Sequence, residues 1–507
     1  MGRVIGCRVL FDWDFNGVYT DESANLVRCN GDTRLAPPEA NLFAAQGIVD
    51  KATIELRNAA GRYSPLNTGG ALYSAIQNGG AYHVPCYVET TIDGGSSWQR
   101  LFTGITQIPR ETGRTHDGMP TVSFECKGRD ELLRQIRRST SQSDFRARAD
   151  AGLTEADLIL AYLTAEGLTS GDYAIDTGMV TIPWAWLDDE SPLEDMWQMA
   201  AAAGGRLYTD ETGKWRYENM AHWLRSPHQT SQQTYTNADW QRLEAWYEDN
   251  ELYSRVTVEY ASRQVDEATV LWEPDEVVQI PAGGSRVLTA TYNSPAYSAP
   301  VIAWRAASSG GGDLTSSVTI TPTFYAQRAT LSVANAHATM AATIYPFQIL
   351  AQAATGGPTA DEERNTWDDG ANSAFFTSRG QRNKSLRGNV YIQSRAQAGT
   401  LAQFLLDRYE KPRLVYRVNG LLGAGVRRPG DRITINDASV MSSGRAAMVL
   451  AVRWRYGEAS YLMDLEAIDA ENLYTYAGTS PGYFIVGGAG TGNQLGSAHA
   501  NRGRLFY

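Results

Sequence analysis

The fold class that the sequence predicts is mainly β with α+β parts, spread over several domains. With 507 residues, the chain is too long for one ordinary hydrophobic core, and about three or four domains are expected. Its 48 glycines and its aromatic residues (26 Tyr, 13 Trp and 13 Phe) favour many short strands joined by tight turns. Helical periodicity is limited to a few segments, so helices are expected to be a minority.

The first segment, residues 1–136, is expected to consist of strands and turns. Ala52–Leu56 alternates apolar and polar side chains and then enters an Asn-Ala-Ala-Gly turn. Because successive side chains of a strand point to opposite faces, Ile54 and Leu56 are expected inside the domain and Glu55 on the other face.

The same segment contains a predicted hairpin. Tyr87–Ile92 and Trp98–Phe102 are strand-like, and the Asp-Gly-Gly-Ser-Ser between them is a turn sequence. Thr121–Cys126 alternates like the earlier strand, and a short helix is expected at Asp130–Arg137.

Residues 137–245 are expected to form a small α/β domain. Thr154 and Asp157 resemble a capping box, with Asp in place of Glu, at the start of a helix. A second helix is predicted with Ser191 as its cap and Glu194 completing the box, and it ends at a pair of glycines. A hairpin of Arg206–Thr209 and Trp215–Glu218 is expected to follow.

The remaining chain is expected to be β structure with one more helix, capped by Ser394 and Gln397 and stopped by Pro412. The changes of pattern predict the domain boundaries. They are 1–136 for a first β domain, 137–245 for the α/β domain, 246–262 with 388–470 for a second β domain, 263–387 for an inserted β-sandwich-like domain, and 471–507 for a Gly-rich C-terminal tail.

One weak internal similarity raises the hypothesis of a duplication. Leu101–Pro109 and Thr121–Asp130 resemble Met448–Tyr456 and Tyr461–Asp469, because each pair is a strand, a polar turn and a strand that ends near an acidic residue. Two unrelated hairpins can share this pattern, so chance similarity stays open as the alternative.

Composition restricts the class of partner. The net charge is −11 and no basic block is present, which argues against a dedicated nucleic-acid binder, since phosphate contacts need clustered Lys and Arg. A surface past which DNA slides without sticking is still compatible with this charge. No apolar run approaches the about 20 residues of a membrane span, and the N-terminus lacks the apolar core of a signal peptide.

The four cysteines, Cys7, Cys29, Cys86 and Cys126, have spacings that fit no zinc motif. Buried reduced thiols are favoured over disulfides, which predicts folding in a reducing cytosol.

Asp12–Gly17 has the D-x-D-x-N-G pattern of the first half of a calcium loop. The twelfth position is Ser23, so the bidentate carboxylate is missing, and Glu22 is one residue out of register. A turn after a strand is therefore favoured over a metal site.

No catalytic, cofactor-binding or metal-binding residues are predicted. His222 and His228 lie six positions apart near Trp223, and solvated or hydrogen-bonded side chains are favoured over ligands. Neither a G-x-S-x-G elbow nor a P-loop is present, and the glycine-dense Gly487–Gly492 is favoured as a flexible tail.

Trp184 and Trp186, followed by Asp188-Asp189-Glu190, allow two interpretations. One is an aromatic platform with carboxylates for a sugar. The other is a buried aromatic pair followed by an acidic helix N-terminus, which the helix dipole favours. The second interpretation is preferred, and the first is the basis of an alternative function, a carbohydrate-binding or carbohydrate-degrading multidomain β protein.

Taken in order, these segments resemble the tail hub (tail-tip) proteins of long-tailed bacteriophages. The resemblance covers roughly residues 5–470 and depends on segment order more than on one strict motif. The matching pieces are Ile54-Glu55-Leu56 with Asn58 and Tyr63-Ser64-Pro65, Leu101–Gly104, Ile182-Pro183, Ser191–Glu194 with Gly204–Tyr208, Ser254–Tyr260, Ala398–Tyr409 with Pro412, Pro429-Gly430-Asp431 and Leu465–Ala467.

The resemblance implies two hub-type β-barrel domains, the α/β domain and the inserted domain. It implies a structural protein of the virion tail tip that is no enzyme, assembled in the host cytoplasm as a homotrimer. Three copies with two barrels each would adapt a sixfold tail tube to a threefold tip around a lumen that conducts DNA without specific binding. The implied partners are the tail tube or distal tail protein, the tape-measure protein, and tail fibre or central tip proteins. Glu55 is then expected to face the lumen or a neighbouring subunit.

Overall fold

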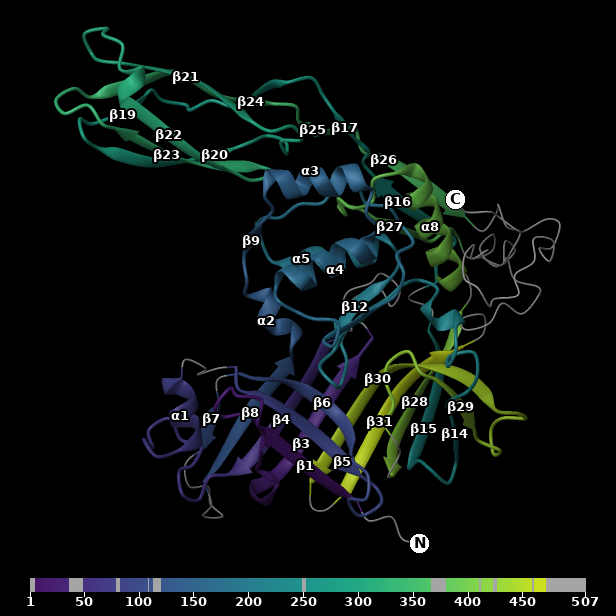
Figure 1. Ribbon diagram of the computed structural model, residues 1–507. Helices are drawn as coiled ribbons and strands as arrows, with labels where there is room; N and C mark the ends of the chain where they lie inside the picture. The colour runs from purple at the N-terminus through teal and green to yellow at the C-terminus, as the bar shows by residue number, and fades with distance from the viewer. Residues whose placement is uncertain are drawn as a thin grey trace.

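The computed structural model describes most of the chain. The described residues are 5–35, 49–78, 83–107, 109–112, 120–248, 252–365, 380–409, 412–422, 426–457 and 460–470. The tail after residue 470 and Gly487–Gly492 lie outside them. Three bodies are stacked in Figure 1, with a broad sheet at the bottom, a helical body in the middle and an elongated arm at the top. The predicted mainly β class with α+β parts is confirmed.

The lower body is one 14-stranded sheet. Its strands are β1 (Gly6–Phe11), β2 (Thr20–Asp21), β3 (Leu26–Arg34), β4 (Val49–Arg57), β5 (Pro85–Thr91), β6 (Gln99–Thr106), β7 (Arg110–Thr112), β8 (Thr121–Gly128), β14 (Gln233–Thr236), β15 (Arg242–Glu248), β28 (Arg413–Leu422), β29 (Arg432–Asn436), β30 (Arg445–Gly457) and β31 (Ser460–Asp469). The main path is β15-β28-β31-β30-β3-β4-β8-β6-β5-β1-β2, with β14 beside β29, β29 beside β30, and β7 beside β8.

Strand β4 behaves as its sequence predicts. Ile54 and Leu56 are fully buried in the core that the sheet encloses. Glu55 points to the opposite face, where it accepts a hydrogen bond from the Arg28 guanidinium at 2.5 Å. The predicted hairpin of β5 and β6 and the alternation along β8 are also present.

Pairing of β3 with β30 makes the sheet continuous between the N-terminal and C-terminal strands. Gly31 lies opposite Trp454 in this antiparallel pair, and a Cβ on Gly31 would lie 2.3 Å from the Trp454 indole. Both halves of the sheet therefore contribute to one hydrophobic core, which contains residues such as Phe124 and Leu465.

The middle body surrounds a second core with helices and small sheets. Its first elements are α2 (Asp130–Arg134), β9 (Arg138–Ser139), α3 (Gln142–Ala151), α4 (Glu155–Ala165), β10 (Tyr173–Ile175), β11 (Asp188–Glu190), α5 (Pro192–Ala202), β12 (Arg206–Thr209), β13 (Trp215–Glu218) and the 3-10 turn η2 (His222–Leu224). A further helix, α1 (Ala71–Gln77), lies against the first strands of the large sheet. Leu158, Leu193 and Leu207 bring α4, α5 and β12 into the same core.

The capping predictions were partly correct. Thr154 and Asp157 form the predicted capping box of α4. Ser191 occupies the predicted N-cap position of α5, but it makes no side-chain capping hydrogen bond, because its buried hydroxyl donates instead to the Leu133 carbonyl oxygen at 3.2 Å. Ser394 accepts from the Gln397 N–H, but the Gln397 side chain accepts from the Gln393 N–H, so the second half of that predicted box is wrong.

Strand partners differ from those that the predicted domain boundaries assumed. β14 and β15 belong to the large sheet rather than to an α/β unit that ends at residue 245. β16 (Arg255–Tyr260) pairs with β26 (Ala360–Asn365) and β27 (Asn383–Leu386), outside the large sheet. This small sheet packs with α8 (Arg395–Tyr409) against the middle core, so alternation identified the β16 strand but not its neighbours.

The arm consists of two sheets around a third core. β18 (Thr269–Trp272), β19 (Val278–Ile280) and β21 (Val301–Ala307) pair with β24 (Ala342–Ala351). β20 (Ser285–Thr291), β23 (Arg328–Asn335) and β22 (Val318–Phe324) form the other sheet. The two sheets share one hydrophobic core, and β17 (Arg263–Val265) with β25 (Ala354–Gly356) forms the neck.

The close approach of the Trp454 ring to Gly31 allows the β3–β30 junction to be tested by mutation. We expect Gly31→Ala to destabilise the chain by about 1–3 kcal/mol, because the added methyl overlaps the Trp454 ring in a packed core. Gly457→Ala in the same strand pair is the control, since its Cβ would meet Arg28 at 3.6 Å, an ordinary contact. Urea unfolding measures both variants. Equal urea midpoints for Gly31→Ala and Gly457→Ala would contradict the prediction, because they would show that the Trp454 ring moves aside without a loss of stability.

Asp195 on α5 generates a pH prediction. Burial raises the pKa of Asp195 to about 7, and the Tyr391 hydroxyl donates a hydrogen bond to its carboxyl. Since the folded pKa lies above the unfolded value of about 3.9, this group's stabilising contribution is complete below about pH 4 and is lost as the pH rises through about 7, with a slope near 1.4 kcal/mol per unit.

We therefore expect Asp195→Asn to flatten the fall in unfolding free energy between about pH 4 and pH 7 relative to the parent chain. Urea unfolding at four pH values measures the slope, and exposed Asp14→Asn is the control. An unchanged slope in Asp195→Asn would contradict the assignment.

Candidate assembly site

The two halves of the large sheet have the same strand order. The N-terminal half runs β1-β5-β6-β8-β4-β3, and the C-terminal half runs β14-β29-β30-β31-β28-β15. Numbered along the chain, both orders are first, fourth, fifth, sixth, third and second. This correspondence supports an internal duplication of one six-stranded unit, with β2 and β7 as additions to the first copy.

The register of the halves agrees with their strand order. Ile105 lies between Pro85 and Lys127, and Met448 lies correspondingly between Arg432 and Ile468. At the next position the Thr106 N–H donates to the Val84 carbonyl at 3.0 Å, and the Val449 N–H donates to the Asp431 carbonyl at 2.9 Å. The first strand is the exception, since β1 is antiparallel to β5 whereas β14 is parallel to β29.

The sequence similarity selected the same strands but a shifted register. It set Leu101 against Met448, whereas the structure equates Thr106 with Val449, a difference of four residues along β6 and β30. Because strand side chains alternate with a period of two, an even shift preserves the pattern of buried and exposed positions. Pattern alone therefore could not determine the register.

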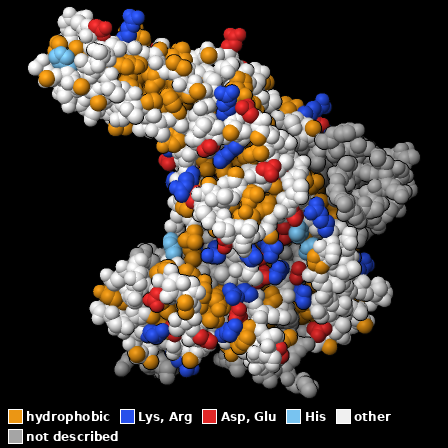
Figure 2. Space-filling view, in the orientation of Figure 1, with side chains coloured by type: hydrophobic (Ala, Val, Ile, Leu, Met, Phe, Trp, Pro, Cys, Tyr) orange, Lys and Arg blue, Asp and Glu red, His pale blue; other side chains and the backbone are white. Residues whose placement is uncertain are grey.

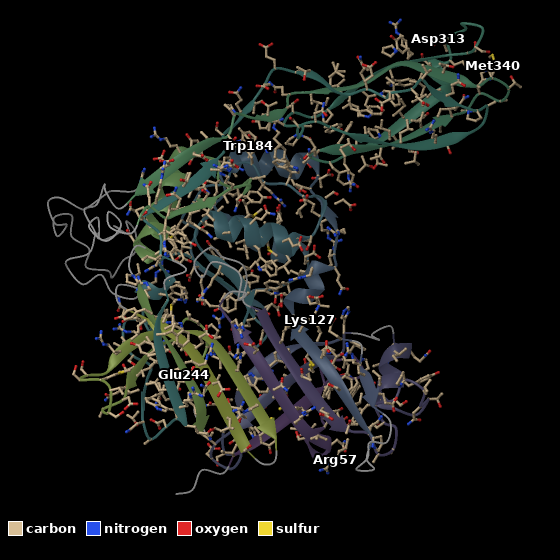
Figure 3. The ribbon with its side chains drawn as sticks, turned by 180° about the vertical axis from the view of Figure 1, so that it is seen from behind. Arg57, Lys127, Trp184, Glu244, Asp313 and Met340 are labelled. Atoms are coloured by element: carbon tan, nitrogen blue, oxygen red, sulfur yellow. The ribbon has the colours of Figure 1, made fainter. Side chains whose placement is uncertain are left out.

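The outer face of the sheet carries alternating charges. Cross-strand ion pairs join Arg453 to Asp32 at 3.4 Å and Arg455 to Asp464 at 3.5 Å, and Arg417 lies between Glu244 and Glu466. Figure 3 places Arg57 and Lys127 toward opposite ends of the first half and Glu244 on the second. Figure 2 shows blue and red side chains interspersed over the lower body. Such a mixed surface gives a polyanion no continuous basic path.

Strands β15 and β7 each have an open edge. Among the described strands, β15 pairs only with β28 and stands at the end of the sheet path, and β7 pairs only with β8. The Tyr247 side chain on β15 is 69% exposed, which is unusual for a large side chain at the end of a core strand. Open edges with exposed apolar side chains are where another chain can add a strand.

The middle body contacts the sheet above the β3–β30 junction. A small pocket there is lined by residues that include Asp50, Glu211 and Arg428. The Thr33 hydroxyl donates to the Asp50 carboxylate at 2.8 Å, and burial raises the pKa of Asp50 well above its usual range. Glu211 forms an ion pair with Arg428, so a charge pair connects the middle body to the second half of the sheet.

His222 and His228 lie beside each other, and each has a hydrogen-bond partner. His222 Nδ1 lies 2.8 Å from an Asp176 carboxylate oxygen, and its Nε2 lies 3.3 Å from Glu218. Burial, with His222 nearby, lowers the pKa of His228 to about 4. Glu218 also pairs with buried Arg206. These contacts agree with the prediction of hydrogen-bonded histidines.

The calcium-like sequence Asp12–Gly17 forms a turn. The buried Asp12 carboxylate accepts hydrogen bonds from the Asn16 and Gly17 N–H groups at 3.1 and 2.9 Å. Aspartate and glycine at these positions thus have a structural role in closing the turn after β1. Within the described residues, no group of three or more His, Cys, Asp or Glu side chains is arranged to hold a metal ion.

Trp184 and Trp186 join the middle body to the base of the arm, where Figure 3 shows Trp184. Both rings pack against Phe145, and the Trp186 N–H donates to the Gln327 side-chain oxygen at 2.8 Å. Asp188 and Asp189, which follow, face Arg328 on the arm at 3.3 and 3.8 Å. Trp186 and the two aspartates are therefore engaged in contacts with the arm, and the structure does not form the sugar platform of the alternative interpretation from them.

All four cysteines are buried free thiols, as predicted. The Cys7 and Cys29 sulfurs lie 3.4 Å apart, and those of Cys86 and Cys126 lie 3.6 Å apart, inside the core of the large sheet. Burial and the neighbouring thiol raise the pKa of Cys126 well above its usual range, which keeps it protonated.

Among the described helices, none combines the length and apolar character needed to cross a membrane. No protein-family model matches the chain, and no curated protein matches it.

Several solved structures are similar to the chain. A tail protein from Neisseria meningitidis MC58 has 12% identity and a TM-score of 0.47, over 92% of this chain and 97% of that one. The 43 kDa tail protein of prophage MuSo2 from Shewanella oneidensis has 10% identity and a TM-score of 0.47, over 92% and 98%.

An Escherichia coli component of the type VI secretion system, described as similar to the T4 tail proteins gp27 and gp5, has 9% identity and a TM-score of 0.38, over 89% of this chain and 75% of that one. These names belong to the class of tail and hub proteins that the sequence segments resemble.

Proposed function

We propose that this chain is a structural tail hub protein that closes the distal end of a phage tail tube as a homotrimer. The observation that carries the proposal is the repeated six-stranded unit, which gives each chain two similar surfaces in one continuous sheet. Three such chains present six related units, so a ring of them adapts a sixfold tube to a threefold tip. The domain division into two hub barrels, an α/β part and an inserted sandwich belongs to the same proposal.

The charge distribution supports a structural role around a lumen. On the outer face of the sheet, arginines are paired with carboxylates, and the net charge of the chain is −11. Neither feature provides the clustered cations that would hold a passing DNA. In this role DNA passes without specific binding, and Glu55 with its Arg28 partner faces either the lumen or the next subunit. The chain performs no catalysis in this proposal, and it is assembled in the host cytoplasm before it enters the tail tip.

The stacked bodies suggest which neighbours each part meets. The large sheet is the surface for the tail tube or distal tail protein and for the tape-measure protein. The arm projects from the middle body, with Asp313 and Met340 at its far end, and is placed to meet fibres, central tip proteins or a receptor.

Imaging assembled tails tests the proposal. We expect cryo-EM to show a threefold ring of this chain at the end of the tube, with three arms, and mass photometry of the purified chain to show a species of three times 55.6 kDa. A chain that is present in tails as a monomer without tube contact would contradict the proposal.

A further inference from the structure

We propose that neighbouring copies of this chain join by β-strand addition, with β15 of one copy pairing antiparallel to β7 of the next. This inference rests on the proposed function, because it takes a second copy of the chain as the partner. It adds the strands, their direction and their register, all derived from the junction that already exists within one chain.

The internal β3–β30 junction is the template. Strand β30 uses residues 445–448 to pair with β29, and then residues 451–457 to pair with β3 on the same side. Its equivalent in the first half is β6 continued by β7. Strand β6 pairs with β5, the equivalent of β29, but β7 has no described strand at the position where β30 meets β3.

The missing strand has a counterpart at the other end of the sheet. In the repeated unit β15 is the equivalent of β3, and among the described strands its second edge is unpaired, as are those of β2 and β14. Within the described part of the chain, one copy therefore has an unpaired acceptor edge at β7 and an unpaired donor edge at β15. A second copy that repeats the internal junction would fill both edges with the same type of contact.

The strand registers determine which residues would meet. Following the paired positions across each half, Ala245 corresponds to Gly31, and Glu111 corresponds to Trp454. Since Gly31 lies opposite Trp454 in the template, Ala245 would lie opposite Glu111 of the next copy. A small residue therefore occupies the equivalent position of both strands, Gly31 on β3 and Ala245 on β15.

Exposure at the two edges agrees with a missing partner. Gly31 is buried in the internal junction, whereas its equivalent Ala245 is exposed, as is Glu111. Tyr247, two positions along the same face of β15, is 69% exposed. Arg110 on β7 has a side chain that is 82% exposed and a distant ion pair to Glu125 at 4.0 Å, so it is available to a partner.

The contact is heterologous, because two different edges meet. Repeating one heterologous contact gives a closed ring when the rotation divides a full turn, and a filament when it does not. Each chain contributes two units, so a closed ring contains an even number of them. Six units correspond to three chains, which agrees with the threefold symmetry of the proposed hub.

Cysteine cross-linking tests the register. Directly opposite side chains in an antiparallel pair have Cβ atoms about 4.5–5.5 Å apart, and a disulfide needs about 3.5–4.5 Å, so a small approach of the two edge strands allows the bond to form. We expect the Ala245→Cys, Glu111→Cys double variant to form covalent dimers and trimers under mild oxidation, both as purified chain and in assembled tails. The parent chain is the control, since its four thiols are buried.

The single variants distinguish head-to-tail from symmetric pairing. Ala245→Cys alone and Glu111→Cys alone should each fail to cross-link, and a mixture of the two should give dimers but no trimers. Cross-linking of Ala245→Cys by itself would show that β15 pairs with β15 and would overturn the proposal.

The failure of this inference is separable from the failure of the hub function. Threefold rings in which the double variant does not cross-link would contradict the edge pairing and leave the hub intact. The absence of any ring in tails and of any trimer in solution would contradict both.

An independent test uses exposed tyrosines of matched accessibility. Tyr247→Lys should weaken self-association at least tenfold with an unchanged melting temperature, because the side chain is exposed in the single chain and covered in the ring. Tyr345→Lys on the arm, where the tyrosine is 72% exposed, should leave association unchanged. Equal association of both variants and the parent would overturn the role of β15.

Discussion

The pairing of β3 with β30 is the constraint on which the rest of the fold depends. It joins two six-stranded units into one sheet, so that their apolar faces enclose a single core. Gly31 permits the Trp454 ring to lie over the strand, and a side chain at that position has no space. The two strands are far apart in the sequence. Their pairing is therefore a contact of large sequence separation, and such contacts slow folding. The two units consequently share one sheet and one core.

The middle body is positioned by the same junction. Thr33 and Asp50 from the first half, and Arg428 from the second, meet Glu211 from the hairpin of β12 and β13. Burial of these two carboxyl groups is tolerated because Asp50 accepts a hydrogen bond and Glu211 has a cationic partner. A shift between the two halves would therefore change the support of the middle body and of the arm above it.

Sequence reasoning predicted the elements better than their partners. Alternation located β4, β8 and β16, because a half-buried strand has a period of two whatever its neighbours are. It could not show that β16 pairs with β26 and β27, since hydrogen-bond partners leave no pattern in a single strand. The N-cap position of Ser191 was predicted correctly, but its capping hydrogen bond was not, because the hydroxyl donates to the Leu133 carbonyl in the tertiary structure. The edges of β15 and β7 were missed for a related reason, because β15 crosses the predicted boundary at residue 245 and an unpaired edge leaves no pattern in the sequence of a strand.

The two copies of the repeated unit differ in the length of one connection. In the first unit the second and third strands, β3 and β4, are separated by residues 35–48, whereas the equivalent strands β15 and β28 are separated by residues 249–412. The larger connection contains β16, the arm and α8, so one location of the same unit is elaborated once per chain. A ring of related units would then carry the arm at every second position. The long connection thus distinguishes the two copies, while the hydrogen-bonded strands beneath it keep the repeated strand order.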